Sequence, residues 1–457
     1  MKSIDWKLGM MKRPSHRSAN LNFKDKFLLL PLVIMLPICS FEGVLRYYLA
    51  LSGLELLIYI PKIMMIVSFS LAIADDLVRN RVSKGLWLLL LLLLVNCVVC
   101  WVYTRNIMQA AFSFWTMIPL LYGCEVFPAL IKIKQNGRML IFVLWAFSVF
   151  SVLLQYFVTF PWIDFNYSLL GMKMQGSKIG SYLGFSRYSG LGIDSFNTSY
   201  LIIFFTIYLL VTIKNKKYSI GVWLSSFIAI AMTLAKATIL AYFIVCIVLL
   251  FINNRWFHKV INGMVAIVIA FGIIFPIISK FITLNLDSYL YQFMFLGFND
   301  RIIKSWPLNL DRLFRYSGWF FGLGAGGVTG GLSHFDPERY IPVDNMYLYL
   351  YCCFGVGMFL LLWFIVKAML TLSKERNWQG TFLWLLGFAI LLIGISQDMV
   401  SSFLPGFIIG CIFRYGVGDV KLPYPIRSST CLARSKAPLQ KFGFLSNSSR
   451  LGGAETS

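Results

Sequence analysis

Long runs of apolar residues, separated by short polar stretches, dominate this chain. About twelve such runs can be drawn, and each approaches the roughly 20 residues that an α-helix needs to cross a bilayer. They lack the alternation of apolar and polar residues that is typical of a transmembrane β-barrel. Because backbone groups in lipid must be hydrogen-bonded within their own segment, the pattern predicts an all-α polytopic membrane protein of about twelve transmembrane helices. The predicted helices are 27–47, 54–74, 85–103, 107–127, 139–160, 196–213, 218–234, 237–252, 260–279, 343–366, 380–397 and 399–414.

Short basic stretches alternate with segments on the opposite side of the membrane, as expected when cytoplasmic loops are enriched in lysine and arginine. We therefore predict that both termini are cytoplasmic. The predicted parts are a basic cytoplasmic N-terminus (1–26), five transmembrane helices (27–160), an outward loop (161–195), four transmembrane helices (196–279), a large outward loop (280–342), three transmembrane helices (343–414) and a disordered cytoplasmic tail (415–457).

Composition agrees with a membrane protein and excludes a soluble one. The chain is 58% hydrophobic and 13% charged, with a mean hydropathy of +0.75, far from the averages of soluble domains. The formal net charge is +22, but most of the 41 lysines and arginines lie in predicted cytoplasmic segments. This asymmetry is the ordinary positive-inside pattern, so it gives no reason to expect a nucleic-acid partner.

The cations on the predicted outward side are more informative, because membrane topology does not require them there. They gather in two stretches, Lys173–Arg187 and Lys280–Arg339. Both outward loops also contain Trp, Tyr and Phe, which are suited to stacking on sugar rings or to lying among lipid headgroups. Long ordered loops in compact proteins are often functional, so the pattern indicates an anionic substrate outside the cytoplasm.

Four cations in the second outward loop are spaced for helical faces. Arg301 and Lys304 fall one turn apart, as do Arg312 and Arg315, so each pair can share one face of a helix. Pro307 lies between the pairs and predicts two short helices with a bend.

Guanidinium groups keep their charge and bind phosphate oxygens through paired hydrogen bonds, which suits a pyrophosphate-bearing substrate. The alternative is that these cations contact lipid headgroups or form ion pairs with Asp300 and Asp311, interactions that contribute little when they are exposed.

A glycine-rich stretch, Gly322–Gly327 (GLGAGG), follows these arginines. Its spelling matches the dinucleotide-binding fingerprint, but that motif needs a preceding strand and a surrounding βαβ unit, which the pattern does not provide. We interpret the glycines as a tight re-entrant turn that would let the backbone approach a substrate.

Asp344 stands where the second outward loop re-enters the membrane, in the sequence VDNMYLYLY. A carboxylate at that depth is costly unless it is paired or functional, and it is suited to accept a proton from an attacking hydroxyl. The alternative is helix capping by Asp344 or Asn345, which residue preferences alone favour.

Two more cations are placed for a site near the membrane surface. Arg187 precedes Ser189-Gly190 and a cap-like Asp194…Asn197 pair that opens the next span; its alternative role is that of an interfacial anchor. Lys236 joins two apolar runs, and such a lysine either extends to the interface or faces a polar cavity.

Three stretches are similar in order and spacing to a known family: SRYSGLGIDSFNTSY before one span, the segment from Arg301 to GLGAG, and DNMYLYLYCCFGVG. The chain resembles the Wzy-type repeat-unit polymerases of bacterial surface polysaccharides, members of the O-antigen polymerase and ligase superfamily. The motifs cover about residues 180–360, and the twelve-span outline covers nearly the whole chain.

The resemblance implies a GT-C-like bundle and a metal-independent, inverting glycosyltransferase that needs no cofactor. Such enzymes act at the periplasmic face of the bacterial inner membrane, so the two outward loops would be periplasmic. They transfer a growing glycan from undecaprenyl pyrophosphate onto the next lipid-linked repeat unit. The implied partners are this undecaprenyl-pyrophosphate-linked oligosaccharide, the lipid bilayer and a chain-length regulator of the co-polymerase type.

By the same resemblance, Arg187 and Arg301 would hold the pyrophosphate, and Lys236 would take a position often occupied by arginine. Arg312 or Arg315 would replace Arg301 if the loop aligns differently.

The resemblance also bears on the base. Related ligases tend to carry histidine where this chain has Asp344, a difference that favours a polymerase over a ligase. His334, ten residues earlier, is the alternative base.

Two other functions compete with a polymerase. An O-antigen ligase-like transferase would use the same donor with a different acceptor. A flippase for lipid-linked oligosaccharides would need charges deep in the bundle, whereas the predicted spans carry few, Lys62 and Lys236 being the main exceptions. The product, whether O-antigen, capsule or exopolysaccharide, stays open.

Overall fold

The computed structural model describes residues 21–80, 82–133, 137–169, 172–178, 180–213, 215–252, 255–282, 288–316, 318–328, 330–375, 377–418, 420 and 422. The predicted disordered tail and most of the predicted basic N-terminus lie outside these residues. The described residues all belong to one compact unit, Met1–Pro423.

Helices make up most of the described chain, and each predicted apolar run overlaps at least one of them. The α-helices are α1 (Phe23–Ser40), α2 (Glu42–Leu51), α3 (Ile60–Val78), α4 (Lys84–Thr104), α5 (Ile107–Leu130), α6 (Arg138–Gln155), α7 (Ser195–Thr212), α8 (Lys216–Met232), α9 (Lys236–Phe251), α10 (Arg255–Ile278), α11 (Tyr289–Asp300), α12 (Trp306–Arg315), α13 (Gly330–Phe335), α14 (Met346–Phe354), α15 (Gly357–Leu372), α16 (Trp378–Ile393) and α17 (Phe403–Val417). The shorter helical turns are η1 (Glu55–Tyr59), η3 (Ser279–Phe281), η4 (Arg301–Ser305), η5 (Ala325–Gly327) and η6 (Pro337–Arg339).

Fewer of these helices meet the requirements of a membrane span than the sequence predicts. Among the described residues, six stretches are long and apolar enough, and α1 with α2, bent by 86°, would make a seventh. Helices α9, α15, α16 and α17 are apolar but shorter. The prediction of a mainly helical membrane protein is confirmed in outline, but the prediction of about twelve spans is not. The six stretches are Glu55–Val78, Lys84–Thr104, Ile107–Leu130, Arg138–Gln155, Ser195–Thr212 and Lys259–Phe281.

Two predicted spans are interrupted, which explains part of the difference. The run 27–47 bends between α1 and α2. The run 343–366 breaks at Gly355, which has a φ of +54° and a position where a Cβ would lie 2.1 Å from the carbonyl oxygen of Phe320. Only glycine tolerates both conditions, so α14 and α15 are separate helices.

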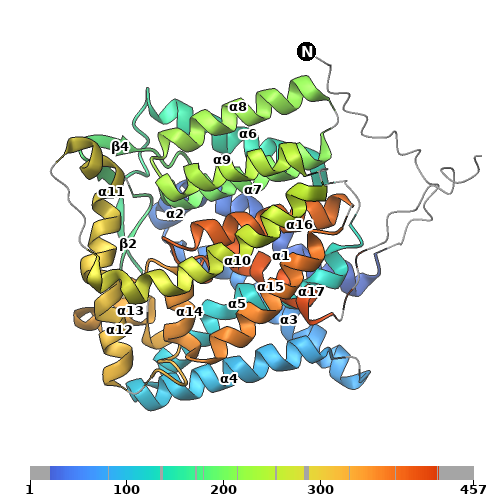
Figure 1. The fold of residues 1–457 in the computed structure, drawn as a ribbon, viewed down its shortest axis with the longest axis vertical. Coiled ribbons are helices and arrows are strands. Elements are labelled where there is room, and N and C mark those ends of the chain that lie inside the picture. The colour runs from blue at the N-terminus through green and yellow to red at the C-terminus, as the bar shows by residue number, and fades with distance from the viewer. Residues whose placement is uncertain are drawn as a thin grey trace, which may run out of the picture. The chain divides into compact units, whose positions relative to one another are not determined.

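Helices α5 and α17 form the centre of the bundle and lie in the middle of the view in Figure 1. They meet through small residues: a Cβ on Gly123 would lie 2.1 Å from the carbonyl oxygen of Phe407, and one on Gly410 would lie 2.1 Å from that of Leu120. Small residues let helices in membranes approach closely. This contact places α17 deep in the core although it is too short to count as a span.

Three charged side chains are buried among the described residues: Asp25 in the first turn of α1, and two in the bundle interior. Glu125 in α5 is 5% exposed and Arg414 in α17 is 8% exposed. Glu125 shares a hydrogen bond with Asp76, which in turn accepts one from Lys24. Charge inside the spans is therefore more extensive than Lys62 and Lys236 alone.

The first predicted outward loop contains two short antiparallel strand pairs, which the sequence did not predict; the chain remains mainly helical, in keeping with the all-α prediction. β1 (Asn166–Leu169) pairs antiparallel with β2 (Met172–Gln175), and β3 (Gly180–Tyr182) pairs antiparallel with β4 (Phe185–Arg187). In Figure 1 the strands lie at the same end of the bundle as α11, α12 and α13, on the left of the view. Both predicted outward loops thus lie at one end.

Candidate functional site

Arg301 lies at a break in the helical path through the second predicted loop. Helix α11 ends at Asp300, η4 is a π-helical turn that begins at Arg301, and α12 follows with Pro307 in its first turn. Pro307 lacks the N–H that would continue the helical ladder, which fits the change to π-type hydrogen bonding in the preceding turn. Two short α-helices are present as predicted, but the π-helical turn Arg301–Ser305 joins them directly. Such turns are frequent at functional sites.

Arg301 contacts the predicted base, Asp344. Arg301 Nε donates to Asp344 Oδ2 at 3.2 Å, and the two side chains are 20% and 36% exposed. Asn345, not Asp344, caps α14, because its Oδ1 accepts a hydrogen bond from the N–H of Leu348 at 2.8 Å. The capping alternative therefore applies to Asn345, and the Asp344 carboxylate faces Arg301.

The same asparagine fixes the segment that follows α16. Asn345 Nδ2 donates to the carbonyl of Ile395 at 2.8 Å. The N–H of Met346, the first residue of α14, donates to the carbonyl of Gly394, which directly follows α16, at 2.7 Å. These bonds dock the start of one helix against the end of another that is distant in sequence. They bring Asp398 close enough to Asp344 for their charges to interact.

Asp398 adds a second carboxylate to the site. Its Oδ1 accepts hydrogen bonds from the N–H groups of Val400 at 3.0 Å and Ser401 at 3.3 Å, in the turn before α17. Burial raises the pKa of Asp398 from 3.8 to about 6, and the charge of Asp344 acts in the same direction. A carboxyl group with that pKa is suited to general-base catalysis near neutral pH.

Tyr340 lies within electrostatic reach of both carboxylates. Burial, followed by the charges of Asp344 and Asp398, raises the pKa of its phenol. A guanidinium, a second carboxylate and a phenol are thus each linked to Asp344, by an ion pair or by charge interaction, at the end of the bundle that holds both predicted outward loops. We call these four residues, Arg301, Tyr340, Asp344 and Asp398, the Arg301 cluster.

Arg312 is engaged by other groups of the protein. Its Nε and Nη2 donate to the hydroxyl of Tyr103 at 3.0 Å and 2.9 Å. Nη2 also donates to the carbonyl of Gly327 at 3.1 Å, and Nη1 donates to that of Arg339 at 3.3 Å. These bonds tie α12 to α4 and to the glycine-rich stretch, which assigns Arg312 a structural role.

The glycine-rich stretch packs against helices. A Cβ on Gly324 would lie 2.4 Å from the Cβ of Cys100, and one on Gly326 would lie 1.9 Å from the carbonyl oxygen of Gln109. The N–H of Gly326 donates to Ser113 Oγ at 2.6 Å. The φ of +75° at Gly324 confirms the predicted tight turn. The backbone of this turn packs against α4 and α5, whereas the sequence suggested that it would approach a substrate.

Arg187 and Lys236 meet at the turn between α8 and α9. Arg187 Nε donates to the carbonyl of Thr233 at 3.4 Å. Lys236 Nζ donates to the carbonyl of Phe293 in α11 and lies 5.0 Å from the centre of its ring. Arg301 lies about 12 Å further along that helical path, at 1.5 Å per residue. Arg187 and Lys236 thus both lie at the turn between α8 and α9, and Lys236 contacts the helix that leads to Arg301.

The remaining predicted residues are exposed. Arg315 lies in the last turn of α12. His334 lies on the short helix α13, with its ring 4.5 Å from that of Phe335. Neither belongs to the Arg301 cluster, so Asp344 and Asp398 are better placed than His334 to serve as a base.

Sequence reasoning missed Asp398 and Tyr340. Asp398 is the one acidic residue between the last two predicted apolar runs, in SQDMVSS, and an ionisable group at a membrane surface is a recognisable signal. What the spacing does not reveal is that α14 docks beside it. Tyr340 is one of 22 tyrosines and carries no distinguishing pattern.

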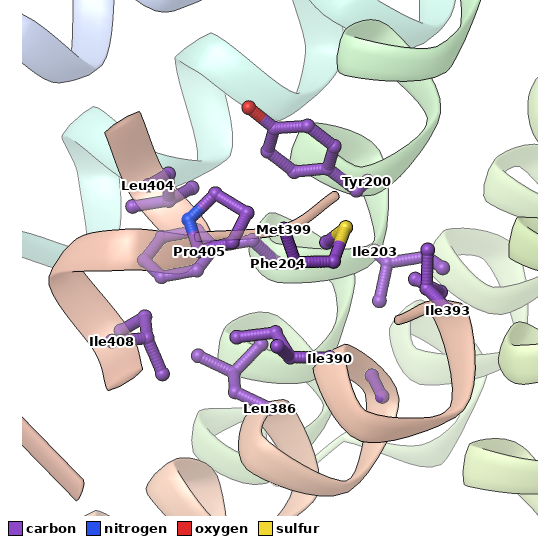
Figure 2. Close-up of a pocket in the computed structure, with 11 residues that line it drawn as sticks. Tyr200, Ile203, Phe204, Leu386, Ile390, Ile393, Met399, Leu404, Pro405 and Ile408 are labelled. Atoms are coloured by element: carbon purple, nitrogen blue, oxygen red, sulfur yellow. The ribbon is translucent and has the colours of Figure 1, made fainter. Parts of the chain in front are cut away.

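A small apolar pocket lies between α7, α16 and α17, and one of its lining residues, Met399, directly follows Asp398 in sequence. Figure 2 shows that its walls are aliphatic and aromatic, with the hydroxyl of Tyr200 at one edge. These walls suit a hydrocarbon and offer nothing to hold a pyrophosphate or a sugar. The pocket is therefore not the site of the polar chemistry. It is lined by Tyr200, Ile203, Phe204, Leu386, Ala389, Ile390, Ile393, Met399, Leu404, Pro405 and Ile408.

Comparison with known proteins yields no match: no family model, no curated protein and no solved structure is significantly similar to this chain. Within the described ranges, no group of three or more His, Cys, Asp or Glu side chains is arranged to hold a metal ion. Any functional conclusion therefore depends on the residues of the site itself.

Proposed function

We propose that this chain is a glycosyltransferase that polymerises undecaprenyl-pyrophosphate-linked oligosaccharide repeat units into a surface polysaccharide. The reaction would take place at the periplasmic face of the bacterial inner membrane, with both termini cytoplasmic. The observation that carries the proposal is the Arg301 cluster, in which a guanidinium and two carboxylates converge at the end of the bundle that holds both outward loops.

The proposed reaction joins two sugars. A hydroxyl of the acceptor attacks the anomeric carbon of the donor glycan, and its proton passes to a carboxylate. The new glycosidic C–O bond forms as the bond to pyrophosphate breaks, and the electron pair leaves on the pyrophosphate oxygen. A fixed cation beside this leaving group lowers the barrier. Attack from the opposite side inverts the anomeric configuration.

The contacts within the cluster support a division of roles. Arg301 supplies the cation for the leaving group. Asp344 already pairs with Arg301, which favours a positioning role for its carboxylate. Asp398 has a pKa of about 6, so it is the better base, because it is ionised at neutral pH and still basic enough to accept a proton. This assignment revises the expectation that Asp344 or His334 is the base.

Two alternatives use the same observations differently. A ligase-like transferase would place the same donor in the same cluster with another acceptor. A flippase is favoured by the charged side chains buried in the bundle, Glu125 and Arg414, since charges inside a bundle often mark transport paths.

The deciding experiment measures the length distribution of lipid-linked and exported glycan after deletion of this protein, with Arg301→Ala beside it. Arg315→Ala is the matched control, because Arg315 is an exposed arginine of the next helix. We expect single repeat units to accumulate in the deletion strain and with Arg301→Ala, and normal polymer with Arg315→Ala.

The other outcomes separate the alternatives. Long chains stranded on the carrier would replace the polymerase with a ligase. Repeat units trapped in the cytoplasmic leaflet would indicate a flippase. Unchanged polymer length and yield after charge-neutral replacement of both Arg187 and Arg301 would overturn the proposed role of the cations.

A further inference from the structure

A second cation with an unusual environment lies in the first half of the chain. Lys62 is near the start of α3, within the apolar span Glu55–Val78, and its Nζ lies 4.4 Å from the centre of the Trp115 ring. It is half-buried, and none of the ion pairs found among the described residues involves it. A lysine in such a position is costly and marks a functional site by default.

Arg46 on α2 adds a second cation close by. Its Nε and Nη2 donate to Glu42 Oε1 at 3.0 Å and 2.7 Å, and its Nη1 donates to the hydroxyl of Tyr167 at 3.3 Å. An arginine has five N–H donors, so these three bonds leave others for a ligand. Glu42 offsets the charge of Arg46, whereas the charge of Lys62 is not offset in this way.

Aromatic side chains join the two cations. The ring of Tyr59, one turn before Lys62, lies 5.8 Å from that of Trp115. The hydroxyl of Tyr59 is within electrostatic reach of Arg46 and Tyr167. We call these five residues, Arg46, Tyr59, Lys62, Trp115 and Tyr167, the Lys62 site.

The Lys62 site lies at the outward end of the bundle. Tyr167 belongs to β1 in the first outward loop, so its bond to Arg46 fixes α2 against that loop. A net positive charge with aromatic neighbours at the edge of an apolar span suits an anion that is attached to a lipid, because the tail stays among apolar helices.

We propose that the Lys62 site binds the phosphate headgroup of a lipid, and that in the polymerase this lipid is the second lipid-linked oligosaccharide. The identity of the lipid rests on the proposed function: a polymerase holds two pyrophosphate-linked substrates at once, and the Arg301 cluster supplies one guanidinium beside two carboxylates. The binding of a lipid phosphate does not depend on that function.

The test titrates the full chain, in phosphatidylcholine nanodiscs, with farnesyl pyrophosphate, and uses an Arg301→Gln background to weaken the first site. In this background we expect Lys62→Gln to raise the Kd for farnesyl pyrophosphate about tenfold, which corresponds to a loss of roughly 1.4 kcal/mol of binding free energy. Lys62→Arg should leave the Kd unchanged. Lys280→Gln is the matched control, because Lys280 is an exposed lysine that also lies over a ring, 5.3 Å from the centre of Phe281. Should Lys62→Gln fail to fold, Lys62→Met gives an apolar replacement suited to a span.

Equal affinities for Lys62→Gln and Lys280→Gln would overturn the site. If phosphatidylglycerol in the nanodisc displaces the probe as well as unlabelled farnesyl pyrophosphate does, the site holds an ordinary phospholipid and its assignment to a second substrate is wrong. Because binding is measured without turnover, normal polymer in a deletion strain would overturn the proposed function and leave this result standing.

Discussion

At the residue scale, the proposed chemistry depends most on the charge of Arg301. Arg301→Gln keeps hydrogen-bonding capacity but removes the positive charge that would face the leaving pyrophosphate. Loss of one stabilising group in a water-excluded site typically lowers kcat by about 10²–10³-fold, and we expect a loss of that order. The measurement is the rate of polymer formation from a lipid-linked repeat unit in vesicles that contain the purified protein.

Two further variants control this prediction. Arg301→Lys retains a charge without the paired donors of a guanidinium, so it should recover part of the rate. Arg315→Gln should leave the rate unchanged. A rate for Arg301→Gln close to that of Arg315→Gln would mean that the cation does not act on the leaving group.

The pKa of Asp398 predicts how activity depends on pH. A general base must be deprotonated, so with a pKa of about 6 the value of kcat/KM should rise as the pH increases through 6 and level off above it. Asp398→Asn should lower the rate by about 10²–10⁴-fold, the usual contribution of a general base, and remove this rise. If Asp398→Asn keeps the rise while Asp344→Asn loses it, then Asp344 is the base.

The same carboxyl group has a predictable effect on stability. Its pKa is raised in the folded protein, so between about pH 3.8 and 6 the folded state binds more protons than the unfolded state. The free energy of unfolding therefore falls as the pH rises through this window. Asp398→Asn should flatten that slope, which thermal unfolding in detergent at several pH values would reveal.

The residues of the Arg301 cluster show what a sequence can and cannot predict at this scale. Arg301 and Asp344 are recognisable alone, because ionisable residues beside apolar runs are unusual. Their contact at 3.2 Å is not predictable, since hydropathy does not say which helices pack together. Asp398 joins them only because Asn345 docks the start of α14 against the end of α16, a tertiary contact with no local signal.

At the element scale, we expect an added side chain in the glycine-rich stretch to destabilise the protein as much as one added between two tightly packed helices. Gly326→Ala would place a Cβ 1.9 Å from the carbonyl oxygen of Gln109. This clash is with backbone, so it can be relieved only if α5 or the glycine-rich stretch shifts. Overpacking typically costs about 1–3 kcal/mol, so we expect a lower Tm in detergent and a lower yield of folded protein.

Gly221→Ala in α8 is the control for that substitution. Nothing lies within 4 Å of the Cβ position at Gly221, and alanine in place of a helical glycine stabilises by about 0.5–1 kcal/mol. Its Tm should therefore stay the same or rise. A Gly326→Ala protein as stable as Gly221→Ala would show that the stretch does not pack tightly against α5.

Among the elements, apolar runs predict where helices occur but not where they end. Each predicted run overlaps a helix, yet the break at Gly355 depends on its φ of +54° and on the nearby carbonyl of Phe320. The strands of the first outward loop were missed because they are only three or four residues long, too short for a recognisable alternation. Length alone would assign α17 to the periphery, whereas Gly123 and Gly410 draw it into the core.

At the scale of the whole molecule, the cations predicted to bind pyrophosphate lie on different elements. Arg187 and Lys236 meet beside α11, and Arg301 lies about 12 Å along the same helical path. Helix α11 therefore connects the turn that holds Arg187 and Lys236 with Arg301. If the Lys62 site binds a lipid phosphate as proposed, this end of the bundle would offer more than one position for an anionic headgroup, as a reaction between two lipid-linked substrates would require.

The proposed function also requires a particular orientation in the membrane, and α7 offers the sharpest test of it. Helix α7 has 18 residues, which span about 27 Å at 1.5 Å per residue, close to the hydrocarbon thickness of a bilayer. The exposed residues Ser186 and Lys217 flank it. We expect a membrane-impermeant maleimide to label Ser186→Cys from the periplasm and Lys217→Cys only after the inner membrane is opened.

The native thiols allow this experiment. The described cysteines are buried or half-buried, and Cys431, which lies outside the described residues, is replaced by serine in every variant. Ser186 adjoins Phe185, whose ring lies 5.8 Å from that of Phe293 in α11, so its label reports the side on which the Arg301 cluster faces. The reverse labelling pattern would place the cluster at the cytoplasmic face of the inner membrane. A glycan donor in the periplasmic leaflet could not reach it there, so a periplasmic polymerase would be excluded.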